Sequence, residues 1–150
     1  VSRPRLLAER FGSLVVPVLG ANALAPVVIL VGGRLIDESV PVGDLLAVHL
    51  LSIPYLFACA AIGVLCSVTF SRASIAQRVA LGVTFFLFLL ESLVEETEYE
   101  SLGAVAPMRY FSPNDILLEG SYDLTGVGVL VIMTGVALLV SQFVFLRRDL

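Results

Sequence analysis

A few polar side chains lie within or beside long apolar stretches of the sequence, and they are the first candidates for chemistry. The group comprises His49, Glu91, Asn22 and the two cysteines, Cys59 and Cys66. Burying a polar or ionisable group in such a stretch costs free energy, so each of these residues is expected to have a function or a hydrogen-bonding partner.

His49 is the single histidine of the chain, and a metal ligand, a proton relay and an interfacial polar residue are its three possible roles. A zinc or copper site needs three or four converging ligands. Cys59 and Cys66 follow ten and seventeen positions later, which is more than two turns along a helix. The interfacial role is therefore favoured, no metal or cofactor is expected, and the thiols are expected to behave as small hydrophobic groups.

Glu91 is the one carboxylate contiguous with an apolar helical stretch, near its outer end. It is a candidate for a substrate path or a proton relay, although a carboxylate there can also simply reach water. Asn22 lies near the middle of the first apolar stretch. It is an equal candidate for lining a polar path and for a hydrogen bond between helices.

No catalytic set accompanies these residues. The sequence has no Ser-His-Asp pattern, no Walker-type glycine loop and no Cys-x-x-Cys pair, so we expect no enzyme, and any ATP hydrolysis would belong to a partner protein. The net charge of −4 argues against nucleic-acid binding, because neutralising phosphates requires a clustered basic surface.

The elements that must position these residues are long apolar helices. Of the 150 residues 58% are hydrophobic and 15% charged, against roughly 45–50% and 25% in soluble domains. Apolar runs near 20 residues are typical of membrane spans. The sequence predicts an all-α polytopic membrane protein, a single transmembrane domain over residues 1–150 with membrane lipid around it. Its four spans are expected at about 14–33, 45–68, 73–94 and 124–146, with an outer connection over 95–123.

Two smaller patterns add detail. Ser112 followed by Pro113, with Gly120 further on, resembles the start and end of a short helix, so one or two short helices are expected at the outer membrane surface. Cys59, Gly63 and Ser67 recur at helical spacing in the second span. Small residues four apart allow close approach of another helix, although chance also produces such a ladder in a chain rich in Ala and Gly.

Charge asymmetry predicts the orientation. All nine basic residues are arginine, and seven of them lie in the start, the connection between spans two and three, and the tail, together with two of the thirteen acidic residues. The other two connections hold two arginines and eleven acidic residues. Cytoplasmic loops retain positive charge. We therefore expect a multi-pass protein of the cell membrane with both termini in the cytoplasm.

Three stretches resemble ABC-2 type permeases, the membrane subunits of type-2 ABC exporters. The opening 1–12 resembles the cytoplasmic segment before their third span. The stretch 104–123 resembles the outer connection before their last span, and the ending 145–150, an aromatic residue followed by two basic ones and an acidic one, resembles their usual close. The family has six spans with both ends inside, and its last four give the topology that the arginines predict.

The resemblance implies an exporter subunit that forms the substrate path, works as a dimer with a second permease copy and draws on a separate ATP-binding cassette subunit. That subunit would press on the cytoplasmic segments. The residues implied in coupling are Arg5, Glu9, Arg10, Arg72 and Arg78. Because the first two spans of the family have no counterpart here, the chain is expected to be a fragment or a shortened product. The family does not specify the cargo.

A different class of function stays open at this stage. A small helical membrane scaffold or assembly factor would have the same spans and the same charge asymmetry without moving anything, and the arginines would then serve topology alone. An intramembrane enzyme is disfavoured because no converging catalytic residues are present.

Overall fold

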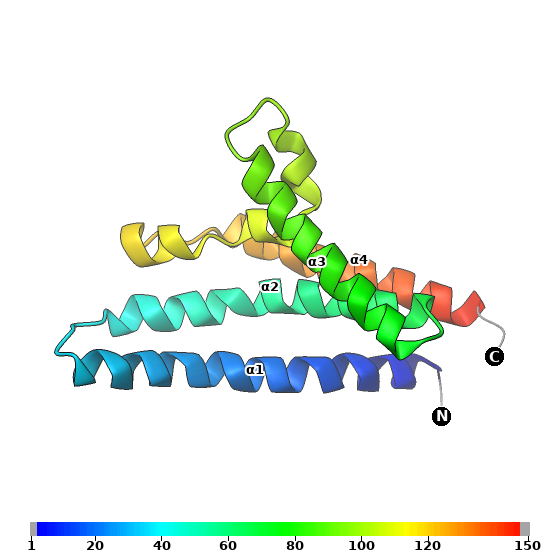
Figure 1. The fold of residues 1–150 in the computed structure, drawn as a ribbon, viewed down its shortest axis with the longest axis horizontal. Coiled ribbons are helices and arrows are strands. Elements are labelled where there is room, and N and C mark those ends of the chain that lie inside the picture. Colours follow the sequence, from blue (N-terminus) through cyan, green and yellow to red (C-terminus); the bar gives the residue numbers. More distant parts are fainter. Residues whose placement is uncertain (1–2, 148–150) are drawn as a thin grey trace.

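The computed structural model describes residues 3–147, and over this range the chain is helical with no strand. Residues 1, 2 and 148–150, which belong to the predicted arginine-rich start and tail, lie outside the described residues. Four long helices dominate the fold (Figure 1). They are α1 (Arg3–Leu35), α2 (Val42–Thr69), α3 (Ala73–Val94) and α4 (Leu124–Arg147).

All four helices are long and apolar enough to cross a membrane. Even the shortest, the 22-residue α3, extends about 33 Å at 1.5 Å per residue, against about 30 Å for the hydrocarbon core. Large apolar side chains lie exposed along their outer faces, as at Val16, Leu81 and Leu139. Exposed apolar surface on this scale suits lipid and not water. The prediction of an all-α protein with four membrane-length helices is confirmed.

Helix α1 begins at Arg3, eleven residues before the predicted start of the first span. The early residues favour a helix because Leu, Ala, Glu and Arg all have high helix propensity, and Arg5 pairs with Glu9 one turn later. Such a pair adds support at i, i+4 spacing. The span and the helix therefore differ, because the helix begins before the apolar segment. Within that segment it continues through both Pro17 and Pro26.

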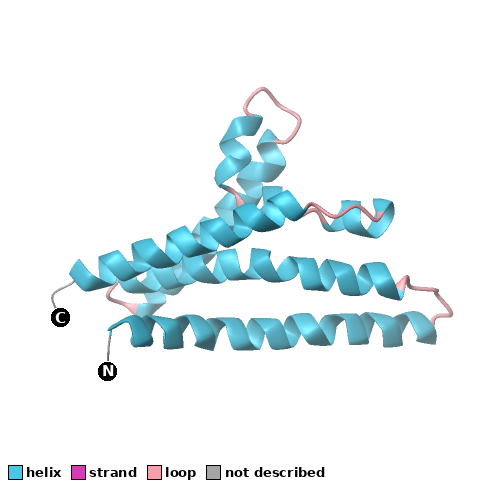
Figure 2. Cartoon of the chain, turned by 180° about the vertical axis from the view of Figure 1, so that it is seen from behind, coloured by secondary structure: helices cyan, strands magenta, loops and turns pink. Residues whose placement is uncertain are grey.

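The termini and the connection between α2 and α3 lie at one end of the molecule, which we call the terminal end (Figure 1). The connection between α1 and α2 lies at the opposite end, as the view from behind also shows (Figure 2). The described parts of the three arginine-rich segments, which are the start of α1, the connection between α2 and α3, and Arg147 at the end of α4, thus share one end, as four crossings require.

Helix α2 is central and packs against each of the other three long helices. Its buried residues are mostly small, with Ala58, Ala61 and Val64 almost fully enclosed. On α4 the matching residues include Leu130 and Ser141, both with 0% exposure. Small residues let helix backbones approach closely, which is how helices associate when lipid removes the hydrophobic driving force.

Helix α3 is inclined across α2 and contacts neither α1 nor α4 through its backbone (Figure 1). Its far end and the segment after it project away from the other three helices (Figures 1 and 2). The described chain then returns through two short 3-10 helices, η1 (Glu100–Val105) and η2 (Pro107–Tyr110), and a single π-helical turn, η3 (Asp115–Glu119).

Each of these short elements packs on a long helix: η1 on α3, η2 on α3 and α4, and η3 on α2. The η3 turn ends at Gly120, whose φ of +62° is left-handed, a conformation that glycine adopts without a Cβ clash. The position of these elements at an outer membrane surface stays a prediction.

Candidate functional site

The five residues implied in partner coupling all lie exposed toward the terminal end of the molecule. Arg5, Glu9 and Arg10 are on the first turns of α1, and the Arg5 Nε donates to Glu9 Oε1 at 3.0 Å. Arg72 precedes α3 directly, and Arg78 lies in its second turn. We call this group the arginine face. The fold brings its two halves, far apart in the sequence, to one end.

The part of this face between α2 and α3 is a tight connection. The Phe70 N–H donates to the Cys66 carbonyl and ends α2. The Arg72 carbonyl then accepts from the N–H groups of Ile75 and Ala76, 3.0 Å each, and begins α3. Both helices are hydrogen-bonded almost up to Ser71. The connection between α2 and α3 is therefore short.

Helix α4 joins the same end through aromatic rings. The Arg10 guanidinium lies 6.0 Å from the centroid of the Phe145 ring, and the Arg147 guanidinium lies 4.1 Å from that of Phe143. Both distances are within the range of cation–π attraction. The first contact ties the start of α1 to the end of α4.

Asn22, the first candidate for a polar path, is bonded to the neighbouring helix. Its Nδ2 donates to the His49 carbonyl of α2 at 2.8 Å, and its Oδ1 accepts from the Ser52 hydroxyl at 3.1 Å. The same hydroxyl also lies 2.7 Å from the His49 carbonyl. Pro54 lies nearby in α2 and leaves the carbonyl of Leu50, next to that of His49, without its helical donor.

His49 makes a local contact. Its Nδ1 lies 2.8 Å from the Leu45 carbonyl one turn earlier, so the tautomer with a proton on Nδ1 is the one that fits. Within residues 3–147 no three His, Cys, Asp or Glu side chains gather as a metal site. Cys59 and Cys66 are free thiols on α2.

Glu91, the second candidate for a path, is buried at the end of α3 inside a charged cluster. Its Oε1 lies 3.8 Å from Arg109 Nη1 of η2. Arg109 also donates from Nη2 to Glu100 Oε1 at 2.5 Å and from Nη1 to the Glu100 carbonyl at 2.6 Å. One cation is therefore shared by two carboxylates. We call Glu91, Glu100, Gly103 and Arg109 the outer cluster.

Gly103 makes this cluster possible. A Cβ at that position would overlap Glu91 Oε2 and would stand 3.2 Å from Arg109 Nη1, so only glycine leaves room for the carboxylate. Glu91 Oε2 is buried against it and has no hydrogen-bond partner in the described chain. The carboxylate is thus enclosed by protein on the side that faces η1.

A second close approach holds the start of α4. Asp123 Oδ1 accepts from the Gly126 N–H at 2.9 Å, the arrangement of a helix N-cap. A Cβ on Gly126 would lie 2.6 Å from both Asp123 Oδ2 and the Tyr110 carbonyl of η2. Two glycines therefore fix the returning segment at both of its ends.

Sequence reasoning selected Glu91 but missed Arg109 and Gly103. The available signal was the charge of Arg109, the only basic residue in the acidic stretch 95–123. Gly103 carried no local signal because its φ is ordinary, and only the approach of Glu91 requires a glycine there.

Comparison of the chain with models of known families, with curated proteins and with solved structures gives no match. The function of the chain must therefore be inferred from its residues and their geometry.

Proposed function

We propose that this chain is a membrane-spanning permease subunit of an ATP-driven ABC-2 type exporter, acting with a second permease copy and a separate ATP-binding cassette subunit. The observation that carries the proposal is the arginine face. It collects exposed charge from α1 and from the connection between α2 and α3 at the end that also holds the termini. Positive charge retained on one side marks that side as cytoplasmic, where ATP is found.

The arginine face would transmit movement of the partner subunit to the helices. Arg72 lies in a connection that ties two helices with little slack, so a partner pressing on it moves α2 and α3 together. Because α3 makes no backbone contact with α1 or α4, a change in its inclination would be resisted mainly by its packing on α2 and by the short helices η1 and η2. Rigid-body movement of packed helices is a common way to switch a transporter between two arrangements.

The proposed path lies between two copies, as the family resemblance implies, and the exposed apolar side chains of the long helices leave surface for a contact with a second copy. Within one copy, the hydrogen bonds of Asn22 favour the alternative of an interhelical tie. The enclosure of Glu91 favours a structural role, in which its ion pair with Arg109 holds the connection 95–123 against α3. Asn22 and Glu91 would then support the helices that line the path, and neither side chain would contact the cargo.

Co-purification tests the proposal. The chain is co-expressed with a candidate ATP-binding cassette protein, and the complex is isolated in detergent. We expect a stable complex, and we expect Arg72→Glu and Arg78→Glu to reduce the recovered partner at least tenfold, about 1.4 kcal/mol, because charge reversal opposes the contact. Arg34→Glu, at the opposite end of α1, is the matched control and should leave recovery unchanged.

The opposite results have a clear meaning. If the native chain recovers no ATP-binding partner, or if Arg34→Glu weakens recovery as much as Arg72→Glu, the coupling role is wrong. A complex with other membrane proteins and no ATP-binding subunit would assign the chain to the scaffold class. In that class the arginines serve orientation alone.

A further inference from the structure

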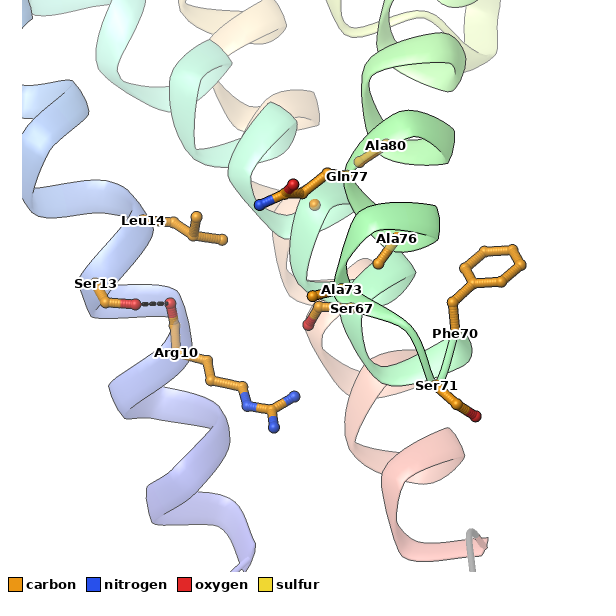
Figure 3. A pocket seen from close by; sticks show the side chains of 11 residues that line it. Arg10, Ser13, Leu14, Ser67, Phe70, Ser71, Ala73, Ala76, Gln77 and Ala80 are labelled. Atoms are coloured by element: carbon orange, nitrogen blue, oxygen red, sulfur yellow. Dashed lines mark hydrogen bonds between the residues drawn. The ribbon is translucent and has the colours of Figure 1, made fainter.

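A cleft of about 530 Å³ opens at the terminal end between α1 and α3, with α2 as its floor (Figure 3). It exists because α3 leans away from α1. Its floor and its α3 wall carry small residues, among them Gly63, Ser67, Ala76 and Ala80. Two members of the ladder of small residues on α2, Gly63 and Ser67, therefore line an open space here. A volume of this size is typical of sites for small molecules.

The cleft is polar at one end and apolar at the other. Arg10 extends from α1 into its mouth, and Gln77 points toward α1 from the opposite wall (Figure 3). Leu14 and Ala80 line the deeper part. Arg10 is also the last charged residue before an uncharged stretch that continues to Arg34, so it marks the depth at which hydrocarbon gives way to headgroups.

Arg10 brings to this mouth a positive charge that no described carboxylate compensates. No carboxylate in the described part of the chain forms an ion pair with it, whereas Arg5 nearby is paired with Glu9. Its one aromatic contact, to Phe145, is long at 6.0 Å. A guanidinium presents five N–H donors in a planar fork that matches phosphate oxygens, so an anionic group fits the polar end.

We propose that this cleft binds an anionic phospholipid of the cytoplasmic leaflet, with its phosphate at Arg10 and an acyl chain against Leu14 and Ala80. A transmembrane helix placed in the same cleft would press apolar side chains onto Arg10 and Gln77 and leave them unsatisfied. An amphiphile satisfies both ends at once. Anionic lipid is enriched in the cytoplasmic leaflet. If the arginine face is cytoplasmic, the cleft therefore opens to the leaflet that contains this lipid. The proposal needs that orientation and does not need the exporter function.

Native mass spectrometry of the full chain in detergent tests this site, with phosphatidylglycerol and phosphatidylcholine as the probes. We expect tighter binding of phosphatidylglycerol by the native chain. Arg10→Gln should reduce that preference roughly fivefold to tenfold, because one cation near a headgroup contributes on this scale. Ala80→Phe should weaken both lipids because it fills the space for the acyl chain.

Arg78→Gln is the matched control. It removes a charge from the same end on a residue that does not line the cleft, and it should change the preference less than twofold. An equal effect of Arg78→Gln and Arg10→Gln would overturn the proposal, because bulk surface charge would then explain the preference. Unchanged lipid binding in Ala80→Phe would overturn it as well.

The same spectra report a competing occupant. A dimer mass that Ala80→Phe abolishes, with no lipid adduct on the native chain, would assign the cleft to a second copy and reject the lipid. Helix content by circular dichroism checks that each variant is folded, and Ala80→Leu replaces Ala80→Phe if the larger side chain prevents folding.

Discussion

Arg109 of η2 and Glu91 of α3 form an ion pair, with Nη1 3.8 Å from Oε1, and the pair joins the end of one long helix to the segment that returns toward the next. The side chain of Glu91 is only 12% exposed and that of Arg109 26%. Coulomb attraction is strongest where water is excluded. The outer cluster thus couples α3 to the start of α4, although the two helices make no backbone contact.

Replacing Arg109 by Met should destabilise the protein by about 3 kcal/mol, because Glu91 would remain buried without a countercharge. Reversible unfolding in detergent micelles measures the effect. Arg78→Met, an exposed arginine of α3 in no ion pair of the described chain, should change stability by less than about 0.5 kcal/mol.

The double variant Glu91→Leu with Arg109→Met extends this prediction. It should recover much of the loss, since removing both partners leaves no buried charge. A double variant as unstable as Arg109→Met alone would show that packing, and not charge, holds the cluster.

Gly103→Ala should disturb the same cluster by a different route. The new methyl group would occupy the place of Glu91 Oε2, and overpacking of this kind costs about 1–3 kcal/mol. Gly82→Ala in α3 is the control, since nothing lies within 4 Å of a Cβ there. It should stabilise the helix by roughly 0.5–1 kcal/mol. Equal melting temperatures for Gly103→Ala and the native chain would contradict the close approach.

Asn22→Leu should weaken the interface between α1 and α2. The amide makes two hydrogen bonds across it, and interhelical bonds in membranes contribute about 0.6 kcal/mol on average and up to about 1.7. A double-mutant cycle with Ser52→Ala isolates the bond between the two side chains. If Asn22→Leu left stability unchanged, neither bond would hold the interface, and Asn22 would return to the alternative of lining a polar path.

Orientation can be tested by cysteine labelling. Cys59 and Cys66 are first replaced by alanine to remove the native thiols. A cysteine at Glu98 should then react with a membrane-impermeant maleimide added to intact cells, and one at Ser74 should react only after the membrane is opened. Labelling of the Ser74 position from outside would reverse the topology and remove the cytoplasmic argument for the arginine face.

The sequence alone determined the helices, and it predicts the side of the membrane on which their charged ends gather. Four uncharged or nearly uncharged runs must form helices in lipid, because every backbone polar group there needs an internal partner. The bounds of α4 follow from where its uncharged run stops, between Asp123 and Arg147, whereas α3 extends past both ends of its run, to Ala73 and Val94. At α1 the same logic located the span but not the helix. Arg3 to Ser13 are helical because their residues have high helix propensity and because Phe11 packs against Val64 and Val68 of α2.

Only the tertiary structure decided which residues meet. Glu91 and Arg109 are eighteen positions apart, and Asn22 and Ser52 thirty, and no local periodicity relates such pairs. The inclination of α3 likewise has no sequence signature, yet it opens the cleft beside Arg10. These features depend on which small surfaces of α2 each neighbour packs against, and lipid-facing and helix-facing apolar residues have the same composition.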